Sequence, residues 1–445
     1  MSVLESTPRK KISVLTYGCR ANQYDSGALE HLLNNNFEVV HPDTTSDIVV
    51  LNSCAITEQA EMEARQMIRK IKRKNPATRI VVTGCSAQVS AGKYQNEGLA
   101  DLVVGNEYKS KIVDYLVSEE GLDLTHDRLG RFESVFYEGG IKSPKNTRSF
   151  LKIQDGCSQF CSFCIVPFAR GLNRSVEPQK VLDSLYELAA KGVHEAVLTG
   201  IHLGTYGKDL NPKTDLLKLL KLIEEKKPIH RVRVSSIDPE ELSDEMIEFF
   251  TDSQVFCGHL HLPLQSGDDE ILRRMRRRYT AQYFEDLTNK IKKKNPDICL
   301  GTDVIVGFPG ESEAQFENTY SLISNAPLSY LHVFPYSSRE GTKANGFADT
   351  VSLALKKKRV ARLRILSEEK RQLFYQSQIG RIEEVVVESY AKGNRGMTRN
   401  YIDVALEFVP FDARLTKVYL QGISNEEVCA RPVLDTGDTL MSFSV

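Results

Sequence analysis

Short apolar runs that read as β-strands alternate with helical patterns along most of this chain. In the first part of the sequence, four strand-like runs are separated by helical patterns such as Asp25–Leu33 and Glu58–Lys74. The strand-like runs are Ile12–Thr16, Ile48–Asn52, Ile80–Thr83 and Leu102–Val104. Because alternating strands and helices build mostly parallel sheets, the sequence predicts an N-terminal parallel α/β domain, which we place at residues 9–122.

A second α/β series follows a polar stretch at residues 139–149, which reads as a linker. Six further strands are predicted, at Phe150–Ile153, Ala196–Ile201, Val232–Ile237, His259–Leu264, Asp303–Gly307 and Leu331–Tyr336. Eight β/α units close the usual barrel, so six predict a partial (β/α)6 barrel, which we place at residues 143–373. A long charged helix at Leu353–Gln376 ends this region.

The tail of the chain has a different pattern. Ile402, Val404, Leu406 and Phe408 alternate with Tyr401, Asp403, Ala405 and Glu407. This period of two is typical of a half-buried strand. With further strand-like runs at Val385–Val387 and Val418–Leu420, it predicts a small C-terminal β-barrel at residues 376–443.

The composition and the absence of targeting segments limit the roles that the nine cysteines can have. The formal net charge is −1, so any contact with a polyanion must come from local basic patches. The N-terminus lacks the apolar stretch of a secretory signal, and no apolar run is long enough to span a membrane. We therefore expect a cytoplasmic protein without membrane partners. Structural disulfides are rare there, so metal binding or catalysis is the natural use of the cysteines.

Three cysteines form a tight motif directly after the first strand of the second series. Cys157, Cys161 and Cys164 are spaced C-x3-C-x2-C, with no further cysteine or histidine close by; the next histidines are His194 and His202. Three thiolates do not complete a tetrahedral zinc site, which needs four ligands. On a four-iron cluster they would leave one iron without a protein ligand, able to bind a small molecule.

This spacing resembles that of the radical S-adenosylmethionine enzymes. The resemblance implies a [4Fe–4S] cluster on the three cysteines, with S-adenosylmethionine on its open iron as the source of a 5′-deoxyadenosyl radical. It also points to strand ends that contact the cofactor: the segment 198–204, the segment 301–311, and Ser235 with Ser236. The residues expected to bind S-adenosylmethionine are Phe163, Thr199, Gly200, Ser235, Asp303 and Ile305.

A second group of cysteines is dispersed in the sequence. Cys19, Cys54 and Cys85 each lie one to three residues beyond a predicted strand of the N-terminal domain. The carboxyl ends of parallel strands share one edge of a sheet, so the three thiols should meet there. A second three-thiolate site is the simplest interpretation, and buried core cysteines are the alternative. Cys257, Cys299 and Cys429 show no such arrangement.

Together the two triplets resemble the methylthiotransferases, which join an N-terminal α/β domain, a radical S-adenosylmethionine barrel and a C-terminal TRAM domain. The matching segments are residues 16–26, 51–57, 81–88 and 155–171, and the likeness covers nearly the whole chain. Residues 22–24 and 167–171 look most like the branch that modifies N6-threonylcarbamoyladenosine beside the tRNA anticodon. Two other branches modify isopentenyladenosine in tRNA and an aspartate of a ribosomal protein.

The resemblance implies two [4Fe–4S] clusters with divided tasks. The cluster on Cys19, Cys54 and Cys85, the residues expected to be catalytic, would hold or donate sulfur, and the barrel cluster would supply the radical. The methylthio group would replace a hydrogen on carbon 2 of the adenine, so the base must lie between the clusters. The implied partners are the anticodon loop of tRNA and an electron donor of the reductase or flavodoxin type.

Basic residues offer three candidate contacts with RNA. One group lies on a helix of the first domain and one follows the fourth strand of the barrel; a solvated helix face is the alternative. The first group is Arg65, Arg69, Lys70, Lys72, Arg73 and Lys74, and the second is Arg273, Arg274, Arg276, Arg277 and Arg278. In the tail, Lys392, Arg395 and Arg399 could form a third, although a purely structural barrel is the alternative.

Two other functions stay open from the sequence. The first is another branch of the family, which methylthiolates isopentenyladenosine in tRNA or a ribosomal aspartate. The second is an iron–sulfur electron carrier with an RNA-binding tail, which would not cleave S-adenosylmethionine. Ligation by three cysteines at both sites argues against the carrier, because four-cysteine ligation suits simple electron transfer.

Overall fold

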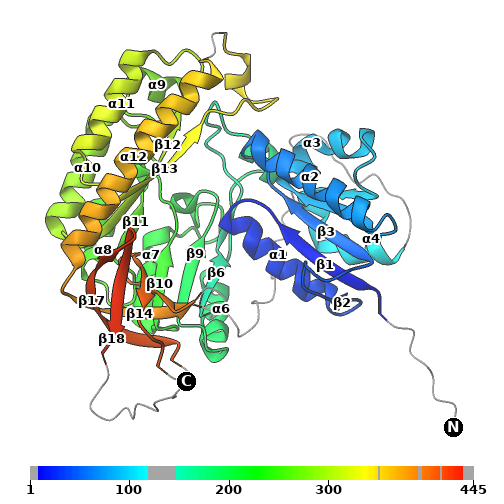
Figure 1. The fold of residues 1–445 in the computed structure, drawn as a ribbon, viewed down its shortest axis with the longest axis horizontal. Coiled ribbons are helices and arrows are strands. Elements are labelled where there is room, and N and C mark those ends of the chain that lie inside the picture. Colours follow the sequence, from blue (N-terminus) through cyan, green and yellow to red (C-terminus); the bar gives the residue numbers. More distant parts are fainter. Residues whose placement is uncertain (1–8, 119–146, 349–350, 389–392, 411–412, 434–445) are drawn as a thin grey trace.

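The N-terminal part of the chain is a five-stranded parallel sheet with helices on its faces (Figure 1). The computed structural model describes residues 9–118, 147–348, 351–388, 393–410 and 413–433. The sheet order is β2-β1-β3-β4-β5, with strands Lys11–Thr16 (β1), Glu38–Val39 (β2), Ile48–Ser53 (β3), Arg79–Gly84 (β4) and Leu102–Val104 (β5). Its helices are Arg20–Leu33 (α1), Glu58–Lys74 (α2), Cys85–Asn96 (α3) and Ile112–Val117 (α4), with a 3-10 turn at Asn106–Lys111 (η1). The predicted α/β domain is confirmed, although the two-residue edge strand β2 and the first turn of α1 were missed.

The second α/β region is a partial barrel of six strands in chain order. Two parallel three-stranded sheets, β6-β9-β10 and β11-β12-β13, meet through a 3.0 Å bond from Ile237 N–H to the His261 carbonyl. The strands are Arg148–Lys152 (β6), Glu195–Thr199 (β9), Arg231–Val234 (β10), His259–His261 (β11), Cys299–Val306 (β12) and Tyr330–Pro335 (β13), and a short hairpin pairs Gln154–Asp155 (β7) with Arg174–Ser175 (β8). Among the described residues β6 and β13 do not pair, so the barrel is open on one side.

Helices cover the outside of this partial barrel (Figure 1). They are Pro178–Ala190 (α6), Leu216–Lys226 (α7), Asp244–Asp252 (α8), Asp269–Arg274 (α9), Ala281–Lys294 (α10), Glu313–Asn325 (α11) and Leu353–Gln378 (α12), while the short helix Val166–Arg170 (α5) follows the second cysteine motif. Leucine, isoleucine and valine on their inner faces join the strands in one large apolar core. Helix α1 of the N-terminal domain contacts β6, at the open side of the barrel.

The C-terminal region is a closed five-stranded barrel, as predicted. Its strand order is β14-β15-β16-β18-β17, with Ile382–Glu388 (β14), Arg395–Thr398 (β15), Asp403–Leu406 (β16), Leu415–Ser424 (β17) and Glu427–Pro432 (β18). Val404 and Leu406 are buried while Glu407 is exposed, which confirms the period-two pattern. No helix in the described part of the chain is long and apolar enough to cross a membrane.

Two fully buried arginines attach this small barrel to the large one. Arg231 and Arg233 flank the buried carboxylate of Glu195, with Nε–O distances of 2.7 and 2.9 Å. Their outer nitrogens donate to carbonyls of β15, at Met397 (2.7 Å) and Thr398 (3.0 Å). Each arginine therefore pairs with Glu195 of the large barrel and donates to a carbonyl of β15 in the small one. These bonds fix the position of the C-terminal barrel on the large barrel.

Candidate functional site

The three dispersed cysteines come together at one edge of the N-terminal sheet. They follow β1, β3 and β4, which are neighbours in the sheet: Cys19 caps α1, Cys54 directly follows β3, and Cys85 begins α3. Gly18 makes this approach possible, since its φ is +101° and a Cβ there would lie 2.7 Å from the Cys54 Sγ. We call these three residues the sheet triad.

The sheet triad is a crowded, mostly buried group of thiols. Burial, together with the charge of Cys85, raises the pKa of Cys54 to about 12. Burial also raises the pKa of Cys19. The neighbouring Arg170 lowers this pKa, and Cys85 raises it further. Each pair of the three sulfurs thus lies close enough for mutual electrostatic repulsion. The Ile56 backbone N–H donates to the Cys54 sulfur at 3.5 Å.

A buried ionic network lies beside the sheet triad. Asp25 accepts from Lys109 (3.0 Å), Lys152 (2.5 Å) and Arg170 (3.0 Å), and Arg170 and Lys152 also pair with Asp155. These three cations and two carboxylates carry a net charge of +1. The network joins α1 of the first domain to β6 and α5 of the barrel, and its surplus charge favours thiolates at the triad.

The C-x3-C-x2-C cysteines gather in the loop between β7 and α5. Burial raises the pKa of Cys161, opposed by Arg277, whose Nη1 donates to the Cys161 sulfur at 3.6 Å. Burial, with repulsion from Cys161 and Cys157, raises the pKa of Cys164. The Gln159 backbone N–H donates to the Cys157 sulfur at 3.4 Å. We call Cys157, Cys161 and Cys164 the loop triad.

His202, which lies far along the sequence, reaches the loop triad. Its Nδ1 is 3.7 Å from the Cys157 sulfur, and its Nε2 is 3.0 Å from Glu241 and 3.4 Å from Asp238. Asp238 also pairs with Arg277 at 2.7 Å, so one carboxylate holds the two residues that contact the Cys157 and Cys161 sulfurs. The sequence distance was therefore a poor guide: His202 sits just beyond β9, at the same barrel edge as the loop triad.

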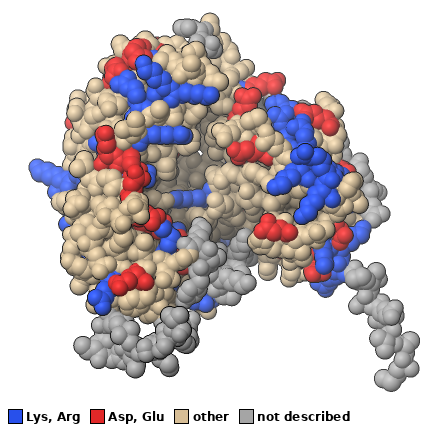
Figure 2. Space-filling view, viewed as in Figure 1, with Lys and Arg blue, Asp and Glu red and all other residues tan. Residues whose placement is uncertain are grey.

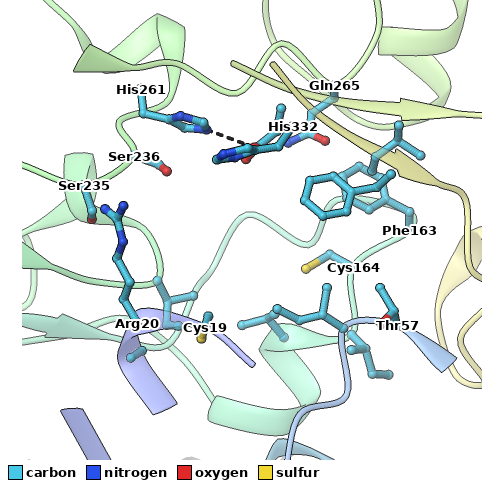
Figure 3. Close-up of a pocket in the computed structure, with 18 of the residues that line it drawn as sticks. Cys19, Arg20, Thr57, Phe163, Cys164, Ser235, Ser236, His261, Gln265 and His332 are labelled. Carbon is cyan, nitrogen blue, oxygen red and sulfur yellow. Dashed lines mark hydrogen bonds and ion pairs between the residues drawn. The ribbon is translucent and has the colours of Figure 1, made fainter. Parts of the chain in front are cut away.

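One cavity of about 520 Å³ connects the two triads (Figure 3). Cys19 of the sheet triad and Cys164 of the loop triad both line it. Every residue predicted to bind S-adenosylmethionine also lines this cavity: Phe163, Thr199, Gly200, Ser235, Asp303 and Ile305. The structure thus brings all six to one place, while their contacts with the cofactor stay predictions.

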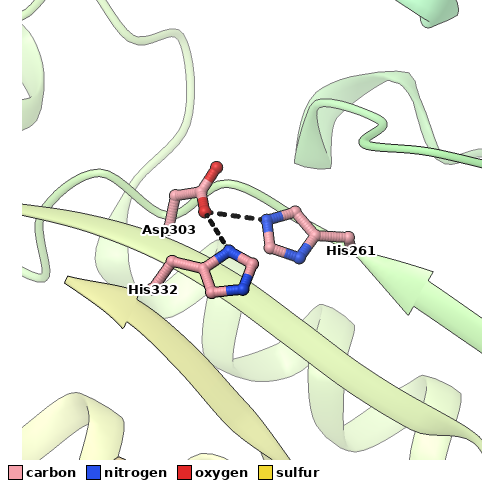
Figure 4. Close-up of side chains that lie close together, drawn as sticks. All are labelled: His261, Asp303 and His332. Atoms are coloured by element: carbon pink, nitrogen blue, oxygen red, sulfur yellow. Dashed lines mark hydrogen bonds and ion pairs between the residues drawn. The ribbon is translucent and has the colours of Figure 1, made fainter. Parts of the chain in front are cut away.

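One wall of this cavity is polar, and the sequence pointed to its Asp303 but not to the histidines around it. The Oδ1 of Asp303 on β12 lies 3.0 Å from His261 Nε2 on β11 and 3.1 Å from His332 Nδ1 on β13 (Figure 4). Tyr330 links this group to His259, its hydroxyl lying 3.1 Å from His261 Nδ1 and 2.8 Å from His259 Nε2. The sequence signal that could have revealed it is the spacing of His259 and His261, which are two residues apart and so lie on the same face of one strand.

Comparisons with known proteins agree with this arrangement. Residues 151–323 match the radical SAM superfamily, and residues 11–105 match the uncharacterized protein family UPF0004. The threonylcarbamoyladenosine tRNA methylthiotransferase MtaB of Aquifex aeolicus is 37% identical over 92% of this chain and 100% of its own length. The chain belongs to the methylthiotransferase family. The MtaB protein of Bacillus subtilis is also 37% identical, over 88% of this chain and 89% of its own.

This methylthiotransferase is also similar to a member of another branch and to a solved structure. A tRNA-2-methylthio-N(6)-dimethylallyladenosine synthase of Clostridium botulinum (strain Okra) is 33% identical over 88% of this chain and 90% of its own. The radical S-adenosylmethionine methyltransferase TsrM of Kitasatospora setae shares the fold, with a TM-score of 0.54 at 15% identity over 74% of this chain and 75% of that one.

Both triads of this methylthiotransferase fit iron–sulfur clusters. The donors at each site are three free cysteines, the soft ligands that iron–sulfur clusters take. Cationic groups stand beside both triads, Arg170 at one and Arg277 at the other. Backbone and side-chain N–H groups point at their sulfurs, as is usual around such clusters.

The second basic cluster of the methylthiotransferase is only partly engaged within the protein, since Arg273, Arg276 and Arg278 are exposed. The prediction of phosphate contact is wrong for Arg277, which is buried against Asp238 and Cys161. Arg274 lies over the rings of Phe308 and Phe347, at 5.4 Å from each centroid. Arg277 therefore belongs to the surroundings of the loop triad, while contact of the other four arginines with RNA stays a prediction.

The first basic cluster forms a charged face on α2 (Figure 2). Arg65 and Arg69 both pair with Glu97, and Lys72 pairs with Asp101. These carboxylates reduce the positive charge of the face, so its contact with RNA stays a prediction.

The two described basic residues predicted in the tail make contacts within the protein. Arg395 pairs with Asp403 and Glu427. Arg399 donates to the Phe256 carbonyl at 3.1 Å. Both therefore support the structural alternative, and Lys392 lies outside the described residues.

Proposed function

We propose that this protein attaches a methylthio group to carbon 2 of the adenine in N6-threonylcarbamoyladenosine, next to the anticodon of tRNA. The observation that carries the proposal is the cavity lined by both Cys19 and Cys164, because the reaction needs one base within reach of two metal centres. The two MtaB relatives, which match most of this chain, support the choice of substrate.

The two triads divide the work. Cys157, Cys161 and Cys164 would hold the cluster that binds and reductively cleaves S-adenosylmethionine, and Cys19, Cys54 and Cys85 would hold the cluster that supplies sulfur. When bound, these groups provide the radical and the methylthio unit, chemistry that no side chain of this chain can supply. A low-potential reductase or flavodoxin would provide the electron.

The chain itself contributes position and shelter. Thr199, Gly200 and Ser235 end the strands β9 and β10 on the cavity wall and would orient S-adenosylmethionine. The apolar side chains of Phe163 and Ile305 face the same space and would keep water from a reactive radical. The target adenine must leave its stack to enter, which costs least in a single-stranded loop such as the anticodon loop.

Nucleoside analysis tests this proposal. The anaerobically reconstituted enzyme is given anticodon stem-loops that carry N6-threonylcarbamoyladenosine or isopentenyladenosine, and in parallel the ribosomal protein substrate. Methylthiolation of the threonylcarbamoyl RNA alone is expected. Product only on isopentenyladenosine or on aspartate would move the protein to another branch, and absence of 5′-deoxyadenosine under reducing conditions would make it an electron carrier.

A further inference from the structure

The cavity between the triads contains one cation whose charge is not matched by a carboxylate. Arg20 follows Cys19 in the first turn of α1 and lines the cavity, with its guanidinium directed toward Ser235 (Figure 3). It donates to the Tyr401 hydroxyl at 3.0 Å and lies 5.8 Å from the Phe150 ring centroid. Within the described part of the chain no Asp or Glu pairs with it. A guanidinium has five N–H donors, so most of them are available to a ligand.

Among the described residues, Asp303 is the only acidic one that lines the cavity, and it is already paired. Asp303 Oδ1 accepts from both His261 and His332, and these contacts keep the pKa of Asp303 low even though burial would raise it. A carboxylate only accepts, so the Nδ1 of His332 carries the hydrogen that it donates. The Nε2 of a neutral His332 is then an acceptor, half exposed on the cavity wall and bonded to no described residue.

These two groups suit an anionic, hydroxylated substituent. The threonylcarbamoyl group ends in a carboxylate and a hydroxyl, whereas the isopentenyl group is purely apolar. An unmatched arginine in a partly desolvated cavity is unfavourable for an apolar guest and favourable for a carboxylate. Arg20 and His332 together would therefore favour the threonylcarbamoyl nucleoside over the isopentenyl one.

We propose that Arg20 and His332 read the threonyl part of the substrate nucleoside, Arg20 by pairing with its carboxylate and His332 Nε2 by accepting from its hydroxyl. This inference rests on the proposed function and names the residues that determine its specificity. Tyr401 of the C-terminal barrel holds the Arg20 guanidinium, so that barrel contributes to the site as well.

The test compares matched substrates on the reconstituted holoenzyme. Anticodon stem-loops carry N6-threonylcarbamoyladenosine either as the free acid or as its methyl ester, and kcat/KM for methylthiolation is measured for each. Wild-type enzyme should prefer the acid by about 100-fold, the order expected for charge-assisted bonds in a desolvated site. Arg20→Gln should reduce this acid-to-ester ratio to near one, and Arg20→Lys should keep part of it.

The acid-to-ester ratio cancels any general loss of folding or cluster content. Arg364→Gln, which removes an exposed arginine of α12, should retain the wild-type ratio. For His332, the paired substrates are the threonylcarbamoyl RNA and a glycylcarbamoyl RNA without the hydroxyethyl group. His332→Ala should lose about tenfold of that preference, as expected for one hydrogen bond.

Three outcomes would overturn the inference. If Arg20→Gln keeps the wild-type acid-to-ester ratio, Arg20 does not bind the substrate carboxylate. If that ratio is kept while the KM for S-adenosylmethionine rises, Arg20 binds the carboxylate of the cofactor. If His332→Ala keeps the threonyl preference, the role given to its Nε2 is wrong. Failure of the wild-type enzyme to modify the threonylcarbamoyl RNA would refute the proposed function itself.

Discussion

Neutralising Asp25 should loosen the contact between the N-terminal domain and the barrel. Asp25 is 3% exposed and accepts from Lys109, Lys152 and Arg170 at 2.5–3.0 Å. In Asp25→Asn, Lys152 and Arg170 would keep their pairs with Asp155, and Lys109 would lose its pair with Asp25. The summed charge of these five groups would rise from +1 to +2. Removing one partner of a buried ion pair costs about 3–5 kcal/mol, so the variant should lose that much at this interface.

Hydrogen exchange of the anaerobic enzyme measures this loss where it occurs. Amides of α1 and β6 should exchange roughly 10²–10⁴-fold faster in Asp25→Asn, because each 1.4 kcal/mol of opening free energy is a factor of ten. Arg69→Gln is the matched control, since its pair with Glu97 is half exposed and worth about 0–1 kcal/mol. Equal exchange in Asp25→Asn and Arg69→Gln would refute the assignment of interface stability to this network.

The same network predicts a pH dependence of defined sign. Although burial opposes ionisation, Lys109, Lys152 and Arg170 hold the pKa of Asp25 well below its usual range. Its stabilising effect is therefore complete above the unfolded pKa of about 3.9 and is lost as the pH falls through the lower folded value. The difference in stability between wild type and Asp25→Asn should shrink in acid.

Three further changes have distinct expected outcomes. Although burial opposes it, Arg233 and Arg231 lower the pKa of Glu195 to about 2. Glu195→Gln should therefore lower the melting temperature at pH 7, and the difference from wild type should vanish as the pH approaches 2. An unchanged melting temperature at pH 7 would contradict this. His202→Ala removes a contact with the Cys157 sulfur and should make the reduction potential of the loop cluster more negative in an EPR-monitored titration, whereas an unchanged potential would deny it an effect on the cluster. Cys54→Ala should still yield 5′-deoxyadenosine without methylthiolated product, and product from this variant would remove the role given to the sheet triad.

The meeting of the cysteines was predictable because it depends on strand geometry alone. Each member of the sheet triad follows a strand whose apolar run is plain in the sequence, and parallel strands end at one edge. The partial barrel was predictable for the same reason, from six apolar runs spaced by helical patterns. These features use local periodicity, which a single sequence displays directly.

The polar networks were not predictable, because their members are brought together only by tertiary structure. Asp25 pairs with Lys109 and Lys152 across 84 and 127 residues of sequence. The start of α1 was missed for a related reason: Asn22 and Asp25 are buried there, and a polar residue on a buried face hides the helical apolar period. His202 was missed because it is far from the cysteine motif in sequence. The end of β9 brings it to the Cys157 sulfur in the fold.

The open side of the barrel explains why the same helix, α1, forms both the domain interface and a wall of the cavity. A barrel of eight strands fills its own interior with side chains, whereas β6 and β13 do not pair in the described chain and leave a gap. The first turn of α1 stands at this gap, so Cys19 and Arg20 become walls of the cavity. Since the Asp25 network holds the same helix against β6, loosening it displaces two cavity residues as well. A variant of this interface should therefore lose product formation before it loses the fold of either domain.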